Sequence, residues 1–149
     1  MKSLIEKAFF LKKSKLFSHL DLEILLAIAE KLYEDDYDKN ETVFSPGQVA
    51  NRGYIVYSGA VNIYEGATLL KELTIGDFFG DESLFNDQSR GYTAICTQDT
   101  LFLTLSRSHL LSIITECPSV AVTLLQYYSL QLPCRYVSSQ MPESTEVVK

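Results

Sequence analysis

Glycines, carboxylates and a lone arginine fall together in one stretch of the sequence, residues 76–93. Gly76 and Gly80 bracket a pair of phenylalanines, so the backbone can turn tightly at the first glycine and approach a ligand closely at the second. A short helix is expected to open at Glu82 or Ser83, and free N–H groups at a helix start attract anions. The stretch therefore predicts an anion-binding loop.

Two charged side chains of this stretch suit a nucleotide. Arg90 follows Gly80 by ten residues, and its planar guanidinium can hold two phosphate oxygens at once. Asp81 lies beside the same turn, and its carboxylate can accept hydrogen bonds from hydroxyl groups. A carboxylate for sugar hydroxyls, with an arginine and free amides for a phosphate, describes a pocket that binds a nucleotide and cleaves no bond. We expect a binding protein and not an enzyme.

The stretch resembles the phosphate-binding cassette of cyclic nucleotide-binding domains, as in catabolite activator proteins and regulatory subunits of cAMP-dependent kinases. That cassette runs roughly Phe-Gly-Glu-Leu-Ala-Leu, a few loop residues, then Pro-Arg-Ala-Ala-Thr. Asp81 replaces the family glutamate, and Ser83 takes a small-residue position. The residues that match in register are Phe79, Gly80, Leu84, Arg90 and Thr93. We call residues 76–93 the cassette.

The resemblance implies a role for each cassette residue. Arg90 would hold the cyclic phosphate, the amides of Glu82 and Ser83 would share it, and Asp81 would accept a ribose 2′-hydroxyl. Gly80 would allow the ligand to approach the backbone.

Two further ligand contacts are expected from the resemblance. Gly91 lacks the hydroxyl that cGMP-preferring relatives place just after the arginine, which favours cAMP. The aromatic residue over the base could be Tyr127, Tyr128 or Tyr136, and we expect Tyr136, because tyrosines at helical spacing are more often packing residues. No metal or other cofactor is expected.

Three departures from the family pattern leave a second interpretation open. Asp81 is shorter than glutamate, Glu82 adds a negative charge near the phosphate, and the ring of Tyr92 stands where the family has a small residue. The alternative is a degenerate fold that serves as a protein–protein interaction module without a ligand. In that case Arg90 would form an ion pair with Asp81 or Glu82 that closes the loop.

Composition limits the class of protein. A chain of 149 residues fits one domain. The net charge of −6 argues against a nucleic-acid-binding surface. No apolar run approaches the length of a membrane span, and no secretory signal is evident, so we expect a cytoplasmic protein. The three cysteines are widely spaced, which favours reduced thiols over a zinc site or a disulfide framework. A cupin-type metal enzyme is disfavoured, because the only histidines, His19 and His109, both fall in predicted helical regions and not on strands.

The pattern of elements predicts a mainly β fold with flanking helices. Apolar spacing predicts one helix up to about Leu16 and another from Asp21 to about Tyr33. Short strands between Thr42 and Leu105 then favour a β-barrel or jelly roll of about eight strands. Two helices are expected between residues 106 and 132, and the resemblance identifies them as the hinge and lid helices that move over bound nucleotide.

The end of the chain is expected to differ from longer relatives. The polar segment 138–149 is predicted to be disordered, which leaves residues 1–137 as a single cyclic nucleotide-binding-like domain. The chain then stops, without room for a helix-turn-helix domain or a second tandem domain. We therefore expect a stand-alone sensor whose C-terminal helices are recognised by an unidentified protein partner, with a possible homodimer through the C-terminal helix.

Overall fold

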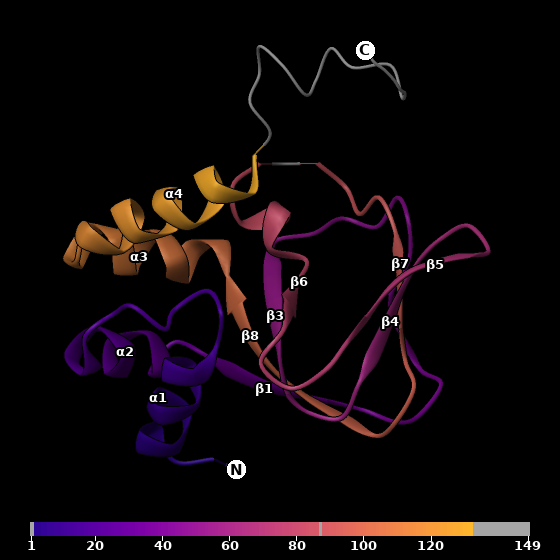
Figure 1. The fold of residues 1–149 in the computed structure, drawn as a ribbon, viewed down its shortest axis with the longest axis horizontal. Coiled ribbons are helices and arrows are strands. Elements are labelled where there is room, and N and C mark those ends of the chain that lie inside the picture. Colours follow the sequence, from indigo (N-terminus) through magenta and orange to yellow (C-terminus); the bar gives the residue numbers. More distant parts are fainter. Residues whose placement is uncertain (1, 87, 133–149) are drawn as a thin grey trace, which may run out of the picture.

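Two four-stranded antiparallel sheets make up the β body of the protein (Figure 1). They are seen in a computed structural model that describes residues 2–86 and 88–132. One sheet has the strand order β1-β8-β3-β6 and the other the order β2-β7-β4-β5. The strands are β1 (Tyr33–Tyr37), β2 (Thr42–Phe44), β3 (Arg52–Ser58), β4 (Val61–Glu65), β5 (Thr68–Leu73), β6 (Phe78–Phe79), β7 (Thr93–Cys96) and β8 (Thr100–Ser106). The eight strands form a jelly-roll-like sandwich and no closed barrel, which confirms the predicted fold class.

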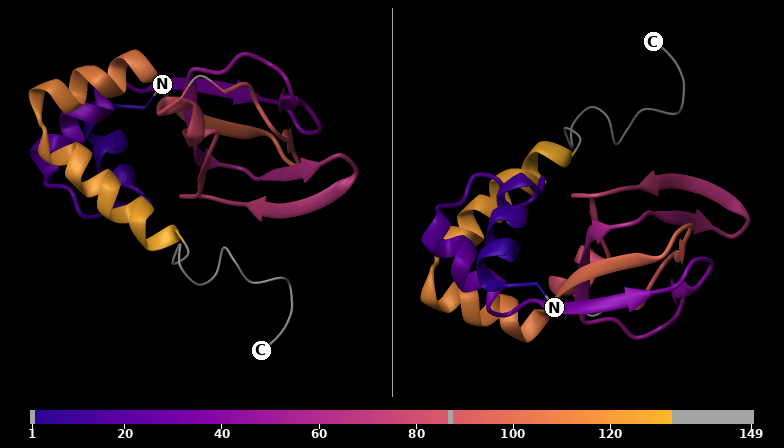
Figure 2. Two further views of the ribbon diagram at one scale, coloured as in Figure 1. Left: turned by 90° about the horizontal axis from the view of Figure 1, so that it is seen from above. Right: turned by 90° about the horizontal axis from the view of Figure 1, so that it is seen from below.

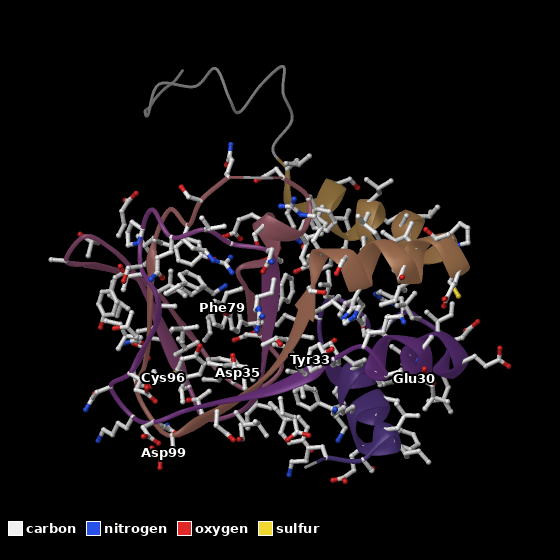
Figure 3. All side chains as sticks on the ribbon, turned by 180° about the vertical axis from the view of Figure 1, so that it is seen from behind. Glu30, Tyr33, Asp35, Phe79, Cys96 and Asp99 are labelled. Atoms are coloured by element: carbon white, nitrogen blue, oxygen red, sulfur yellow. The ribbon has the colours of Figure 1, made fainter. Side chains whose placement is uncertain are left out.

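Aromatic side chains fill the space between the two sheets. Phe79 stacks on Tyr54 with ring centroids 5.0 Å apart, and both rings contact Phe102 edge-on. Figure 3 shows Phe79 among the side chains of this interior. Phe44 and Tyr92 extend the same cluster towards the cassette. The interior is therefore occupied by rings from both sheets.

Four helices gather on one side of the sandwich, as Figure 2 shows from two directions. Their buried faces form a second core with β3, β8 and Leu84. None of the helices in the described residues is by itself long and apolar enough to cross a membrane, and only the bent pair α3 and α4, taken together, reaches that length and composition. The helices are α1 (Leu4–Lys13), α2 (Leu22–Ala29), α3 (Arg107–Glu116) and α4 (Ser119–Gln131).

The helix boundaries follow from local capping. Ser3 and Glu6 form a capping box at the start of α1, and the Ser106 hydroxyl accepts a hydrogen bond from the His109 amide at the start of α3. The two helices expected between residues 106 and 132 are present as α3 and α4. The segment predicted to be disordered, 138–149, lies outside the described residues.

One prediction about the helical region is wrong. The helix expected to run to Tyr33 ends at Ala29, and Tyr33 instead begins β1. This strand carries an acidic segment that precedes the range in which strands were predicted, and it pairs with β8 from Tyr33 opposite Thr104 to Tyr37 opposite Thr100. Backbone pairing with β8 stabilises a strand that its own composition disfavours.

Two turn glycines differ in how closely they are surrounded. Gly59 joins β3 to β4 with φ +97°, and a Cβ built there would lie 2.4 Å from Oγ1 of Thr100 and 2.6 Å from the carbonyl oxygen of Asp99. Gly66 joins β4 to β5 with φ +60°, and a Cβ there would meet no atom within 4 Å. Both need a left-handed backbone, but only Gly59 also needs the space.

Alanine substitutions at Gly59 and Gly66 separate the need for a left-handed backbone from the need for space. We expect Gly59→Ala to lower the free energy of unfolding by about 3 kcal/mol or more, because strain and steric overlap add. Gly66→Ala is expected to cost only about 1 kcal/mol, from the left-handed backbone alone. Urea unfolding of both variants measures the difference, and equal losses would contradict the close packing at Gly59.

Candidate functional site

The cassette begins where β6 ends, with a sharp turn at Gly80. Gly80 has φ +71° and precedes a 3-10 helix, η1 (Asp81–Leu84). A Cβ at Gly80 would lie 2.9 Å from Nη1 of Arg90 and 3.2 Å from Cδ1 of Tyr54. The sequence predicted that this glycine admits a close approach, and the structure shows that the approaching group is the Arg90 guanidinium. The predicted short helix is present, one residue earlier than expected.

Arg90 lies inside the protein, with 5% of its surface exposed. Nη1 donates hydrogen bonds to the carbonyl oxygen of Gly80 at 2.9 Å and to Oγ of Ser83 at 3.2 Å. Nη2 donates to the carbonyl oxygen of Arg52 at 2.8 Å. The guanidinium also lies 4.1 Å from the centre of the Phe44 ring, within range of a cation–π interaction. The cassette is built around this cation.

The ion pair that would close the loop is absent. Across residues 2–86 and 88–132, the ion pairs are Lys7 with Glu34 and Lys15 with Asp77, and neither involves Arg90. Carbonyl and hydroxyl oxygens, which carry no net charge, therefore take the place of a carboxylate around this guanidinium. A buried charge without a counter-charge is costly, so Arg90 retains the capacity to attract an anion.

Asp81 is bound by the C-terminal helix. The Tyr128 hydroxyl, from α4, donates to Oδ2 of Asp81 at 2.5 Å. Burial raises the pKa of the Asp81 carboxyl above its usual range, and the Tyr128 hydrogen bond opposes this effect without cancelling it. Burial, followed by the charge of Asp81, also raises the pKa of Tyr128. The Tyr128 hydroxyl is thus hydrogen-bonded to the carboxylate that the resemblance assigns to a ribose hydroxyl.

Tyr92 turns its ring into the sandwich and its hydroxyl towards the cassette. The Gly80 amide donates a hydrogen bond to the Tyr92 hydroxyl oxygen at 2.8 Å, and the ring packs edge-on against Phe44 at 5.3 Å. Burial, then the negative charge of Glu82, raises the pKa of the Tyr92 phenol. The ring therefore takes up space beside the amides at the start of η1.

The remaining predicted site residues differ in burial: Ser83 is buried, whereas Glu82 and Gly91 are exposed. Ser83 is 1% exposed, and its Oγ lies within hydrogen-bond distance of the carbonyl oxygens of Gly80 and Arg52. Its amide donates a long bond of 3.4 Å to the Gly80 carbonyl. Glu82 and Gly91 are exposed, and Tyr136 lies outside the described residues. The structure thus brings Gly80, Ser83 and Arg90 together, with Asp81 facing α4.

The cassette contacts both helical regions of the chain. Lys15, between α1 and α2, forms an ion pair of 2.7 Å with Asp77. Burial acts to raise the pKa of Asp77, but the hydrogen bonds from Lys15 and from the Thr74 amide outweigh it and lower the pKa. Within η1, the Ser83 carbonyl oxygen accepts hydrogen bonds from Nε and Nη2 of Arg107, at the start of α3, at 3.1 and 2.7 Å. Side chains from both helical regions therefore contact the cassette directly.

A cavity of about 420 Å³ opens beside Arg90, under the loop between β2 and β3. Sequence reasoning missed it, because residues 48–52, Gln-Val-Ala-Asn-Arg, form no recognisable binding motif. The polar and aromatic residues of its lining are Phe44, Gln48, Asn51, Arg52, Tyr54 and Arg90.

The groups that the site presents are suited to binding a ligand. Within the described residues, no three His, Cys, Asp or Glu side chains cluster as metal ligands would. Cys96 and Cys117 are free thiols. What the geometry offers is a buried cation, a carboxylate and a short helix start.

Comparison with known proteins agrees with this geometry. The family described as "Cyclic nucleotide-binding domain" matches residues 34–117, which is more than half of the chain. A CRP-like cAMP-activated global transcriptional regulator from Mycobacterium tuberculosis is 27% identical over 127 residues, which cover 82% of this chain. A cAMP-dependent protein kinase regulatory subunit from Debaryomyces hansenii is 29% identical over 100 residues, or 66% of this chain.

A solved structure also resembles the protein. The crystal structure of Thermus thermophilus catabolite activator protein superposes with a TM-score of 0.71 at 29% identity and covers 79% of this chain and 58% of that one. The chain spans 57% of the length of the mycobacterial regulator and 22% of the kinase subunit.

The bond from Tyr128 to Asp81 predicts unequal effects of two adjacent substitutions. We expect Tyr128→Phe to lower the free energy of unfolding by about 1–2 kcal/mol, because it removes a hydrogen bond to a largely buried carboxyl group. Tyr127→Phe is the matched control: its ring packs on Phe78 and has no hydroxyl bond among the described residues. Urea denaturation at pH 7 measures both, and equal stability of the two variants would contradict the contact.

Proposed function

Because the chain belongs to the cyclic nucleotide-binding domain family, we propose that it is a non-catalytic regulatory module that binds a cyclic mononucleotide at its cassette. The observation that carries the proposal is Arg90, a buried guanidinium held at the cassette by uncharged oxygens alone. A cyclic phosphate would supply the missing negative charge, and a guanidinium fork matches two of its oxygens. The family match and the register of the cassette support this assignment.

Ligand binding at the cassette would be reported by α4. The ribose 2′-hydroxyl and the Tyr128 hydroxyl would compete for the same carboxylate, Asp81. A ligand that displaces Tyr128 favours a different placement of α4, to the extent that it binds that placement more tightly. The C-terminal helices would then signal to a protein partner, which the exposed apolar side chains of α4, such as Val122 and Leu125, could contact.

The proposed preference is for cAMP over cGMP. Gly91 carries no hydroxyl next to Arg90, and a Cβ built at Gly91 would meet no atom within 4 Å. The position is therefore open but offers no side-chain donor to a guanine ring or to a phosphate. Residue 136, expected to stack on the base, lies beyond the described range, so the base contact remains a prediction.

A specific observation favours the second candidate, an interaction module without a ligand. The Gly80 amide is occupied by Tyr92, and Asp81 is occupied by Tyr128. Both contacts fill positions that the resemblance assigns to a nucleotide. In this alternative the cassette serves only to fix α4, and a protein partner binds the helices.

Three broader expectations remain predictions. The absence of a nucleic-acid-binding surface rests on the net charge alone, and one relative is a transcriptional regulator of which the chain spans only 57%. A homodimer through the C-terminal helix and a cytoplasmic location are likewise proposals, consistent with a family of regulatory domains.

Calorimetric titration with cAMP and with cGMP distinguishes the two candidates. We expect cAMP to bind more tightly than cGMP, and Arg90→Lys to weaken binding by about 1.5–3 kcal/mol, because lysine keeps the charge but loses the fork. Lys39→Gln, on an exposed turn, is the control and should bind as the unaltered protein does.

The second candidate predicts a different result from the same titration. Neither nucleotide would give heat of binding to the unaltered protein. Neither would bind to Tyr92→Ala, in which the ring beside the Gly80 amide is removed. If neither the unaltered protein nor Tyr92→Ala gives heat of binding while both are folded, nucleotide binding is excluded. Circular dichroism of each variant verifies that it is folded.

A further inference from the structure

The cavity under the β2–β3 loop has a composition suited to anions. Two of its lining residues are arginines, Arg52 and Arg90, and no carboxylate contributes to its lining. Its volume of about 420 Å³ lies in the range of small-molecule pockets, which run from about 300 to 1,000 Å³. In a chain of net charge −6, a hollow lined by two cations and no acid is a distinct electrostatic feature.

Arg52 is free to bind a ligand. It begins β3, its side chain is exposed, and no described residue forms an ion pair or side-chain hydrogen bond with its guanidinium. Its backbone carbonyl, by contrast, accepts the bond from Nη2 of Arg90. The backbone of Arg52 thus positions one guanidinium of the cavity while its side chain supplies the other.

Arg90 has donors left over for the cavity. Nη1 uses both of its protons on Gly80 and Ser83, and Nη2 uses one of its two on Arg52. Nε donates to no described residue. Among the described residues, Nδ1 of His109 is the only fully buried side-chain nitrogen or oxygen without a hydrogen-bond partner. Nε of Arg90 has no partner either, so it must be accessible to solvent. Two N–H groups of Arg90 therefore remain for a ligand.

The loop above the two arginines adds polar groups. Oε1 of Gln48 accepts a hydrogen bond from the Ser45 amide at 2.8 Å, which leaves the NH₂ end of that side chain as a donor. Asn51 is exposed, with no side-chain hydrogen bond among the described residues. The loop is held over Arg90 by two backbone bonds, from the Gly47 amide to the Arg90 carbonyl at 2.7 Å and from the Arg90 amide to the Gln48 carbonyl at 3.0 Å.

We propose that this cavity binds a phosphate group, held between the guanidinium groups of Arg52 and Arg90. Two guanidinium forks suit the several oxygens of a phosphate dianion. The rings of Phe44 and Tyr54 form part of the wall and offer a surface on which a planar group attached to the phosphate can stack. The ligand is therefore a phosphate monoester, with inorganic phosphate as the minimal form of the same chemistry.

This site shares Arg90 with the cassette, so the two ligands would compete for its remaining N–H groups, but the rest of its lining is separate. Its lining includes Arg90 but no residue between Gly76 and Ser89, so Asp81, Glu82 and Ser83 take no part in it. Arg52, conversely, is not among the residues that the resemblance assigns to the cyclic ligand. Substitution of Arg52 thus separates the two sites, whereas substitution of Arg90 would affect both.

Calorimetric titration in a phosphate-free buffer tests the proposal, with inorganic phosphate and 5′-AMP as probes and sodium chloride of equal ionic strength as the screening control. We expect both probes to bind and Arg52→Gln to raise their Kd at least tenfold. Lys39→Gln removes one exposed positive charge elsewhere and should change Kd less than twofold. Arg52→Gln keeps the backbone carbonyl that Arg90 uses, so the variant should fold.

The outcomes assign or overturn the site. Equal affinity for the two probes identifies a site for the phosphate group alone, and tighter binding of 5′-AMP adds a contact to its nucleoside. No binding of either probe, or equal losses in Arg52→Gln and Lys39→Gln, would overturn the proposal. A cAMP titration of Arg52→Gln distinguishes the sites, because cyclic nucleotide binding at the cassette should survive this change.

Discussion

The buried guanidinium of Arg90 is the interaction on which the rest of the site depends. Burying a charge is costly unless its donors are satisfied, and here the Gly80 carbonyl, the Ser83 hydroxyl and the Arg52 carbonyl take that role. Each acceptor lies on a different piece of the fold, the turn after β6, helix η1 and the start of β3. Placing one cation therefore fixes three segments relative to one another, and Gly80 must lack a side chain for the guanidinium to fit.

The cassette also links the two groups of helices. Lys15 holds the turn at Asp77 from the N-terminal side, and Arg107 holds the Ser83 carbonyl at the start of α3. Tyr128 adds a contact from α4 to Asp81. These contacts act on the same stretch of backbone that the hydrogen bonds of Arg90 hold in place. The turn at Asp77, the start of η1 and α4 are therefore joined to one another through side chains of the cassette and of the helices.

The sequence was sufficient for the fold class because alternating apolar residues and turn glycines dominate the strands, and it located the turn at Gly80 that leads into a short helix. It failed at β1, where an acidic segment becomes a strand only through pairing with β8, a non-local interaction that composition does not reveal. The partners of the site residues were also out of reach. That Asp81 contacts Tyr128, across 47 positions in the chain, follows from packing and from no local pattern. No sequence motif singled out the exposed Arg52, and only the structure shows that it lines the same cavity as Arg90.

The two internal contacts of the cassette differ in what a ligand must overcome. Exchanging the Tyr128 hydroxyl for a sugar hydroxyl on Asp81 replaces one hydrogen bond by another of the same kind, so the exchange is close to neutral in free energy. At Arg90 the acceptors are uncharged, and an anion brings a charge that they lack, so this contact provides net binding energy. Affinity would therefore come from the arginine, and the position of α4 would be decided at the carboxylate. Because these are separate groups, ligand affinity and signalling can change independently through single substitutions.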